Sequence, residues 1–252
     1  MRFDIITLFP ELFAPFLASG VTRRAYSSGQ VDVRLWNPRD HAEGNYRRVD
    51  DRPFGGGPGM VMMAEPLARC LASIRTERGE GEASQAPVVL FSPIGAPLNH
   101  TAVERWSAST GAVLLCGRYE GIDQRFIDTH VDMQMSLGDF VLSGGEIAAM
   151  ALLDAVARLQ PGVLNDEGSH QFDSFNPALD GLLDCPHYTR PEEWAGQQVP
   201  SALMSGHHAQ IERWRRDQRL FITARHRPDL ITAARQAGLL AAADEAVLAK
   251  LA

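Results

Sequence analysis

The sequence predicts an α/β fold with a mostly parallel sheet, followed by a small helical domain. Short apolar runs typical of buried strands, such as residues 87–91 and 112–116, alternate with longer segments of helical periodicity. Strands and helices that alternate along a chain form mostly parallel sheets. After Pro161 the strand-like runs stop, and an acidic segment leads into helical patterns. We therefore expect two domains of different architecture.

The composition is that of an ordinary globular protein. The 252 residues are enough for a sizeable core; 45% of them are hydrophobic and 22% are charged. A net charge of −7 does not favour indiscriminate binding to nucleic acid, although it leaves room for a local basic patch. The three cysteines are odd in number and lack metal-ligand spacing, which fits a reduced cytosol. We therefore expect a cytoplasmic protein.

The first 36 residues predict a strand, a helix and a second strand, at 3–9, 10–26 and 30–36. The apolar stretch 3–18 is similar to a signal peptide, but two acids and a proline interrupt it. We therefore expect the mature chain to begin here. No run in the sequence approaches the length of a membrane span, so we expect no contact with a membrane.

A long polar loop is predicted at 37–60, and its glycines at 55–59 invite comparison with phosphate-binding loops. No Gly-Lys-Ser/Thr follows them, and no apolar strand leads straight into them, so neither phosphate-binding pattern is met. A nucleotide-phosphate enzyme therefore stays only as an alternative. A helix at 65–78 and a polar linker at 79–85 come next.

Three further strand-like runs each end in a turn. The runs are 87–91, 112–116 and 130–135, and the turns that follow them are 92–95, 117–123 and 136–146. In parallel sheets the ligand crevice lies beyond the carboxyl ends of the strands, so these three turns are expected to form one site.

The turn at 136–146 is the central candidate. Gly144 and Gly145 allow the backbone to approach a ligand closely, and an apolar helix at 147–159 follows directly. Backbone amides at such a helix start can bind polar ligand atoms. Two structural glycines in a tight strand–helix connection would explain the same pattern, so the site depends on the neighbouring turns.

The second half of the chain predicts a linker and a basic helix. Residues 1–160 are expected to form the α/β domain, 161–175 a flexible linker and 176–252 the helical domain. Residues 207–227 contain six arginines but only two acids, and Trp214 lies among them. This composition suits contact with phosphate and stacking on bases. The arginines are Arg213, Arg215, Arg216, Arg219, Arg225 and Arg227. A solvated helix face, or a non-catalytic RNA-binding module, would give the same pattern.

Five blocks in order give the chain a resemblance to a known family. The blocks are 49–60, 115–123, 136–146, 173–175 with 181–191, and 205–209. Together they resemble the bacterial tRNA (guanine-N1)-methyltransferase family of the SPOUT superfamily, over nearly the whole chain up to about Arg227. The resemblance implies a trefoil knot, which is a rare exception to unthreaded topology. It also implies S-adenosyl-L-methionine as methyl donor, a helical tRNA-binding domain, and a homodimer with each active site at the subunit interface. The substrate would be the guanine 3′-adjacent to the anticodon, at position 37.

The resemblance also implies roles for individual residues. The donor is expected to contact Ser92, Pro93, Gly117, Tyr119, Glu120, Gly121, Leu137, Gly138, Asp139, Phe140, Val141, Leu142, Gly144 and Gly145. Arg158 is the expected catalytic arginine, beside the donor turns, and Asp173 is the expected general base, delivered by the partner chain. Arg213, Arg215, Arg216 and Arg219 are the expected RNA contacts. Four residues depart from the family pattern: Ile94, Phe140, Phe172 and His207.

The expected chemistry explains why these residue types are needed. Methyl transfer is an in-line displacement that depends on positioning, but guanine N1 carries a proton that a base must remove. A free aspartate is a weak base, so Asp173 is expected to lie shielded between Phe172 and Phe175, where desolvation strengthens it. Arg158 would stabilise the charge that develops on guanine O6. A loop acid that caps a turn is the alternative for Asp173.

A metal site is left unassigned. Glu120 and Asp139 could hold Mg²⁺ or contact the target base, because both are expected near the donor turns. Acids in such loops also cap helices, so the two residues do not by themselves predict a magnesium site.

Overall fold

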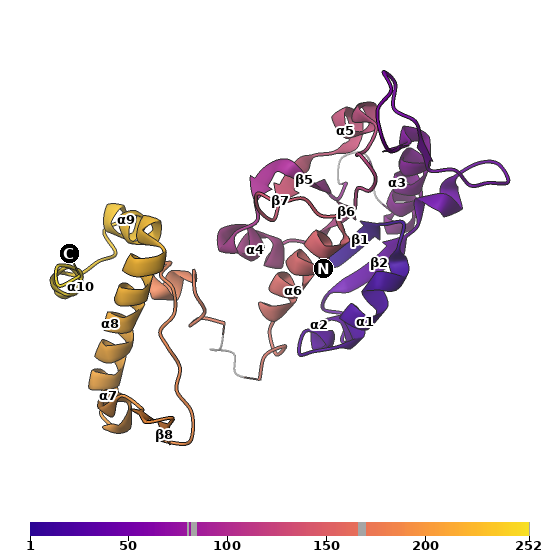
Figure 1. Cartoon of the computed structure of the whole chain (residues 1–252). Coiled ribbons are helices and arrows are strands. Elements are labelled where there is room, and N and C mark those ends of the chain that lie inside the picture. Colours follow the sequence, from indigo (N-terminus) through magenta and orange to yellow (C-terminus); the bar gives the residue numbers. More distant parts are fainter. Residues whose placement is uncertain (80, 82–84, 166–169, 252) are drawn as a thin grey trace. The chain divides into compact units, whose positions relative to one another are not determined.

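The computed structural model describes residues 1–79, 81, 85–165 and 170–251, which divide into two compact units (Figure 1). The first unit is Met1–Asn165 and the second is Asp166–Ala252. Part of the linker expected at 161–175 lies outside the described residues, as does most of the polar linker expected at 79–85. Each unit is described by itself below.

The first unit contains the predicted parallel sheet, with five strands in the order β2-β1-β6-β5-β7. Every strand pairing in this sheet is parallel. The strands are β1 (Arg2–Ile6), β2 (Asp32–Trp36), β5 (Val88–Pro97), β6 (Gly111–Leu115) and β7 (Met133–Ser136). Strands β1 and β6 lie inside the sheet and are almost fully buried, as apolar strands covered on both faces must be. The prediction of an α/β fold with a parallel sheet is confirmed.

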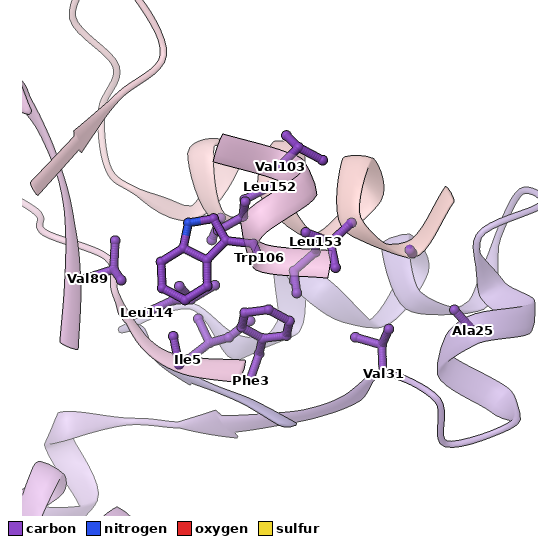
Figure 2. Packing of buried hydrophobic residues seen from close by; sticks show 14 of the residues in the cluster. Phe3, Ile5, Ala25, Val31, Val89, Val103, Trp106, Leu114, Leu152 and Leu153 are labelled. Atoms are coloured by element: carbon purple, nitrogen blue, oxygen red, sulfur yellow. The ribbon is translucent and has the colours of Figure 1, made fainter. Parts of the chain in front are cut away.

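Helices cover both faces of this sheet and create two cores. The helices are α1 (Phe13–Ala18), α2 (Arg23–Ser27), α3 (Ala64–Arg78), α4 (His100–Ser107), α5 (Gln124–His130) and α6 (Glu146–Arg158). Side chains alternate along a strand, so Phe3 of β1 belongs to one core and Ile6 to the other. In the first core the Trp106 ring lies 6.4 Å from the Phe3 ring, between α4 and the sheet (Figure 2). Helix α6 packs in this core, which fixes the turn that precedes it.

The structure corrects three local expectations. The helix expected at 10–26 is a 3-10 turn, Pro10–Leu12, followed by α1 and α2, with a break where Gly20 has φ +71°. The turn expected at 92–95 is instead part of β5, whose register shifts between Phe91 and Ala96. The strand expected at 130–135 starts at Met133, because α5 continues to His130.

Within the first unit, the end of the long polar loop at 37–60 is held by backbone hydrogen bonds to other segments. The loop contains a 3-10 turn, Pro38–His41, and the strand β3 (Asp50–Asp51), which pairs antiparallel with β4 (Val61–Met62). The Met62 amide donates to the Gly121 carbonyl at 2.9 Å, and the Met62 carbonyl accepts from the Asp123 amide. The loop is therefore joined to the turn at 117–123.

The second unit is mainly helical around a small core. Its elements are a 3-10 turn (Pro177–Leu179), the hairpin of β8 (Glu193–Trp194) and β9 (Gln197–Gln198), and the helices α7 (Ser201–Met204), α8 (His208–His226), α9 (Pro228–Gln236) and α10 (Ala242–Leu248). Leu220 of α8 packs with Leu182, Ile231 and Leu248. The hairpin was not expected from the sequence. Across the described parts of both units, no helix is long and apolar enough to cross a membrane.

Candidate active site

A cavity of about 340 Å³ is lined by residues 90–94 of β5, by the turn after β6 and by the turn after β7. Of the fourteen residues expected to contact the donor, thirteen line it: Ser92, Pro93, Gly117, Tyr119, Glu120, Gly121, Leu137, Gly138, Phe140, Val141, Leu142, Gly144 and Gly145. The other, Asp139, is an exposed residue that is not among the lining residues of the described chain. The cavity also contains residues that sequence reasoning missed, of which Arg118 and Ser143 matter most below. Three segments far apart in sequence therefore share one cavity.

Two of the lining glycines have different surroundings. A Cβ on Gly145 would lie 2.8 Å from the Cys116 Cα, so a side chain cannot fit where α6 starts against the end of β6. The Gly145 amide also donates to the Gly117 carbonyl at 3.1 Å. A Cβ on Gly117 would make only ordinary contact, 3.4 Å from Ile122 and 3.8 Å from Leu90. Gly145 is thus required by the fold, while packing alone does not require glycine at position 117.

Tyr119 is held in an uncommon backbone conformation at the mouth of this cavity. Its φ is +61°, which few residues other than glycine adopt. The adjacent Glu120 amide donates to the Met60 carbonyl at 3.0 Å, and Arg39 donates to the Tyr119 hydroxyl at 3.4 Å. Burial, and then the charge of Asp50, raises the pKa of Tyr119, so the phenol stays protonated at neutral pH. Asp50 and Arg39 therefore both hold the Tyr119 hydroxyl by hydrogen bonds.

The departures from the family pattern lie partly in the same cavity. Ile94 and Phe140 both line it and both are exposed, at 82% and 56%. The Phe140 ring also lies close to Gly138, where a Cβ would be 3.1 Å from it. These two side chains offer apolar surface where the family pattern has polar groups. His207 begins α8 and makes no capping hydrogen bond with its side chain.

A set of metal ligands is not found among residues 1–79, 81, 85–165 and 170–251. In these ranges no three His, Cys, Asp or Glu side chains come together in a group that could hold a metal ion. Glu120 and Asp139 are both exposed. The side chain of Glu120 lies against Gly59, where a Cβ would overlap its carboxylate. Glu120 is therefore positioned at the junction of two loops.

Arg158 lies at the far end of α6. It is the last residue of α6 and is half-buried. Twelve residue steps separate it from Glu146 at the start of this helix, a distance of about 18 Å along the axis. Among the described residues, Arg158 is not one that lines the cavity. Helix α6 thus ends away from its own start at the cavity, and the catalytic role of Arg158 stays a prediction.

Asp173 lies in the second unit, in a chain of tight turns. Its amide donates to the His170 carbonyl at 3.3 Å, and its carbonyl accepts from the Asn176 amide at 3.2 Å. The side chain is half-buried, while Phe172 and Phe175 are exposed at 54% and 42%. Phe175 also has Arg227 beside its ring, 5.8 Å from the centroid. The expected shielding of Asp173 between two buried rings is not found in the single chain.

The four expected RNA contacts of α8 differ in how freely they could reach a phosphate. Arg219 is 7% exposed and pairs with Asp184 at 3.4 Å. Arg216 pairs with Asp180 at 2.7 Å and with Asp244 at 2.9 Å, and its side chain is 19% exposed. Arg213 pairs with Asp217 and Asp244 but keeps 41% of its side chain exposed. Arg215 pairs only with the exposed Glu212 in the described chain. The structure thus uses Arg216 and Arg219 to hold the second unit together.

The parallel sheet and the glycine-rich cavity define a class: an α/β protein that binds a small ligand beyond the carboxyl ends of its strands. Comparison with known proteins then gives the family. The family described as "tRNA (Guanine-1)-methyltransferase TrmD" matches residues 1–233, and the chain belongs to it. The resemblance inferred from the five sequence blocks is therefore confirmed.

Individual relatives agree with this assignment. A protein of Paracidovorax citrulli (strain AAC00-1) named tRNA (guanine-N(1)-)-methyltransferase is 80% identical, over 100% of this chain and 98% of the relative. A protein of the same name from Polaromonas sp. (strain JS666 / ATCC BAA-500) is 76% identical, over 100% of this chain and 97% of the relative. A third protein of this name, from Burkholderia mallei (strain SAVP1), is 57% identical, over 100% of this chain and 94% of the relative.

Proposed function

We propose that the protein transfers a methyl group from S-adenosyl-L-methionine to N1 of the guanine at position 37 of tRNA, 3′-adjacent to the anticodon. The observation that carries this proposal is the shared cavity: thirteen residues that the family pattern assigns to the donor meet there from three separate segments. Family membership over residues 1–233 gives the reaction and the kind of RNA. We include in the proposal the trefoil knot of the SPOUT superfamily, a homodimer and a cytoplasmic location.

The cavity suits the donor in size and chemistry. Its volume of about 340 Å³ is within the range of small-molecule sites. Gly117 presents no side chain to the cavity, and Glu120 is a charged residue among those that line it. The donor would supply an electrophilic methyl carbon. The residues of the turns then have only to bind and orient it, which is the main need of an in-line displacement.

The remaining steps belong to Asp173 and Arg158. Asp173 would accept the proton of guanine N1, and Arg158 would stabilise the negative charge that moves to O6. Because α6 separates Arg158 from the cavity of its own chain, we propose that the partner subunit supplies Arg158 as well as Asp173. Docking of the RNA and of the second subunit would also shield Asp173 from water, since its neighbouring rings are exposed in the single chain.

The helical second unit is proposed to bind tRNA. Arg213 and Arg215 support this best, because their side chains are 41% and 45% exposed. Exposed Tyr188 lies against Trp214, 6.1 Å between ring centroids, and adds a surface on which a base can stack. Mg²⁺ could act through the RNA, as the described residues contain no group of three potential ligands.

A nucleotide-phosphate enzyme is not favoured. Gly55, Gly56 and Gly57 lie in an exposed loop with open space where a Cβ would be, and β4 lies between them and the start of α3. A purely RNA-binding role leaves the cavity in the first unit unexplained.

The test is methyl incorporation into bulk tRNA from labelled S-adenosyl-L-methionine, followed by mapping of the modified base. We expect the label at N1 of guanine 37. Calorimetry on the protein alone should detect donor binding without RNA. Label on another base, or no binding of the donor, would contradict the proposal.

A further inference from the structure

A buried ion pair lies behind the cavity, and the sequence analysis gave it no role. Glu146, the first residue of α6, is 1% exposed. Its carboxylate accepts a hydrogen bond from the Thr7 hydroxyl at 2.8 Å and one from Arg118 Nε at 3.1 Å. Arg118 Nη2 lies 2.9 Å from the second carboxylate oxygen. One carboxylate thus joins the end of β1, the turn after β6 and the start of α6.

Arg118 extends this connection to the two turns that form the cavity. Its Nη1 donates to the Ser143 carbonyl at 3.1 Å, in the turn before α6. Its guanidinium lies over the Phe9 ring, 4.4 Å from the centroid, and its own amide donates to the Met62 sulfur at 3.3 Å. Both Arg118 and Ser143 line the cavity. The pair therefore connects two of the turns that line the site.

The packing leaves little room for these walls to move. A Cβ on Gly144 would overlap both Arg118 Nε and Glu146 Oε2, so the backbone of this turn rests directly on the ion pair. A buried carboxylate needs its partners, because an uncompensated buried charge is costly. The N-terminus of α6 adds further stabilisation for the negative charge of Glu146. Arg118 consequently has one well-defined position.

We infer that Glu146 is a positioning residue for the donor cavity. By fixing Arg118, it sets the separation between the turn at 117–121 and the turn at 143–145. The cavity is thereby formed before the donor arrives, and binding does not have to order these turns. The inference rests on the proposed function, since it concerns the binding of the methyl donor.

The chain offers a matched control for a role in stability alone. Asp4 is another fully buried carboxylate, paired with Arg2 at 2.8 Å and Arg78 at 2.6 Å, and it accepts from Trp36 Nε1 at 2.7 Å. None of these four described residues lines the cavity. Loss of either carboxylate should destabilise the fold, but only loss of Glu146 should alter the cavity.

The experiment compares Glu146→Ala, Glu146→Gln and Asp4→Asn in the full chain. Donor Kd is measured by calorimetry, KM and kcat with tRNA, and Tm by scanning calorimetry. We expect Glu146→Ala to raise donor Kd and KM about tenfold, as for loss of hydrogen bonds to a charged group, with kcat at saturating donor within about threefold of the parent. Glu146→Gln keeps an acceptor for Thr7 and Arg118 and should recover part of the affinity. Asp4→Asn should lower Tm and leave donor Kd unchanged.

Two outcomes would overturn the inference. Donor Kd within twofold of the parent in Glu146→Ala would do so, as would an equal loss of affinity in Asp4→Asn. If Glu146→Ala does not fold, Thr7→Val decides. It keeps the shape but removes the hydrogen bond to Glu146 and the one that Thr7 Oγ1 accepts from the Phe9 amide at 3.0 Å. We expect about threefold weaker donor binding, restored in Thr7→Ser, which keeps a hydroxyl for both hydrogen bonds. Unchanged binding in Thr7→Val would then reject the role. A parent protein that binds no donor would instead contradict the proposed function.

Discussion

At the scale of single residues, Gly117 and Gly145 lie in the same cavity but need to be glycine for different reasons. Gly145 lies against the Cα of Cys116, so the fold excludes a side chain there. Gly117 has only ordinary contacts around its Cβ position. Substitutions at the two positions should therefore separate an effect on folding from an effect on binding.

We expect Gly145→Ala to lower the free energy of unfolding by about 2 kcal/mol, because overpacking forces the backbone of α6 or β6 to shift. Gly117→Val should leave this free energy within about 0.5 kcal/mol while it weakens donor binding, since its methyl groups enter the cavity. Urea unfolding and calorimetry measure the two quantities. Unchanged donor affinity in a folded Gly117→Val protein would remove the site assignment.

At the scale of elements, α8 holds the second unit together through its arginines. Asp180, Asp184 and Asp244 are the acids outside α8 that pair with them. Burial tends to raise the pKa of Asp244, but hydrogen bonds from Arg216 and the Ala241 amide outweigh it and lower the pKa. For Asp184 the Cys185 amide and His187 likewise outweigh burial and lower the pKa. These contacts connect α8 to both flanking segments.

This pairing predicts acid sensitivity in the second unit. A carboxylate whose pKa is lower in the folded state stabilises the fold above its unfolded pKa of about 3.9 and loses that contribution as pH falls through the folded value. Hydrogen exchange of α8 and α10 should therefore accelerate below about pH 4. In Asp244→Ala the same exchange should already be faster at pH 7, because the free energy of local opening falls by about 3 kcal/mol. Equal protection in parent and variant would show that the pairs do not hold α8.

The same helix predicts which arginine contacts the RNA. Arg215→Gln should weaken tRNA binding and reduce its salt slope by about one, because one phosphate contact is lost. Donor affinity should not change. Arg216→Gln is the contrast: its partners lie within the second unit, so it should cost stability before it changes the salt slope. If the salt slope of tRNA binding stays the same in Arg215→Gln, Arg215 does not contact the RNA and this helix face is only exposed to solvent.

The sequence could predict the turns of the cavity but not the interactions behind them. Glycine-rich turns after apolar strands are local patterns, and parallel pairing brings them to one edge of the sheet. The pairing of Thr7 with Glu146 joins residues 139 positions apart, which no local pattern contains. Helices α4 and α5 carried a readable signal, since Asn99 and Asp123 cap them, but their segments are short. The helix that carries Arg158 was predicted at nearly its observed length, but no local pattern shows which cavity the arginine serves.

At the scale of the whole molecule, the subunit that supplies Arg158 determines what results from mixing two inactive variants. With Asp173→Asn and Arg158→Ala on separate chains, activity returns only if Arg158 serves the cavity of its own chain. We propose that it serves the cavity of the partner subunit instead, so we expect that mixture to stay inactive. Mixing Gly117→Val with the double variant Arg158→Ala/Asp173→Asn should instead restore about half the activity per dimer, since one intact cavity then meets one intact pair.

Native mass spectrometry must detect the heterodimer in both mixtures. Activity in the first mixture and none in the second would show that Arg158 acts within its own chain. Asp173→Asn alone should keep donor and tRNA binding and lose turnover. Near-normal turnover in that variant would contradict its role as the base.

The length of α6 has a further consequence for the enzyme in dilute solution. If twelve residue steps keep Arg158 from its own cavity, a dissociated subunit can bind the donor but has no arginine with which to complete the reaction. Specific activity should then fall as the protein is diluted below the dissociation constant of the dimer, while donor affinity per chain stays constant. The length of one helix would in this way make the reaction rate depend on the abundance of the protein itself.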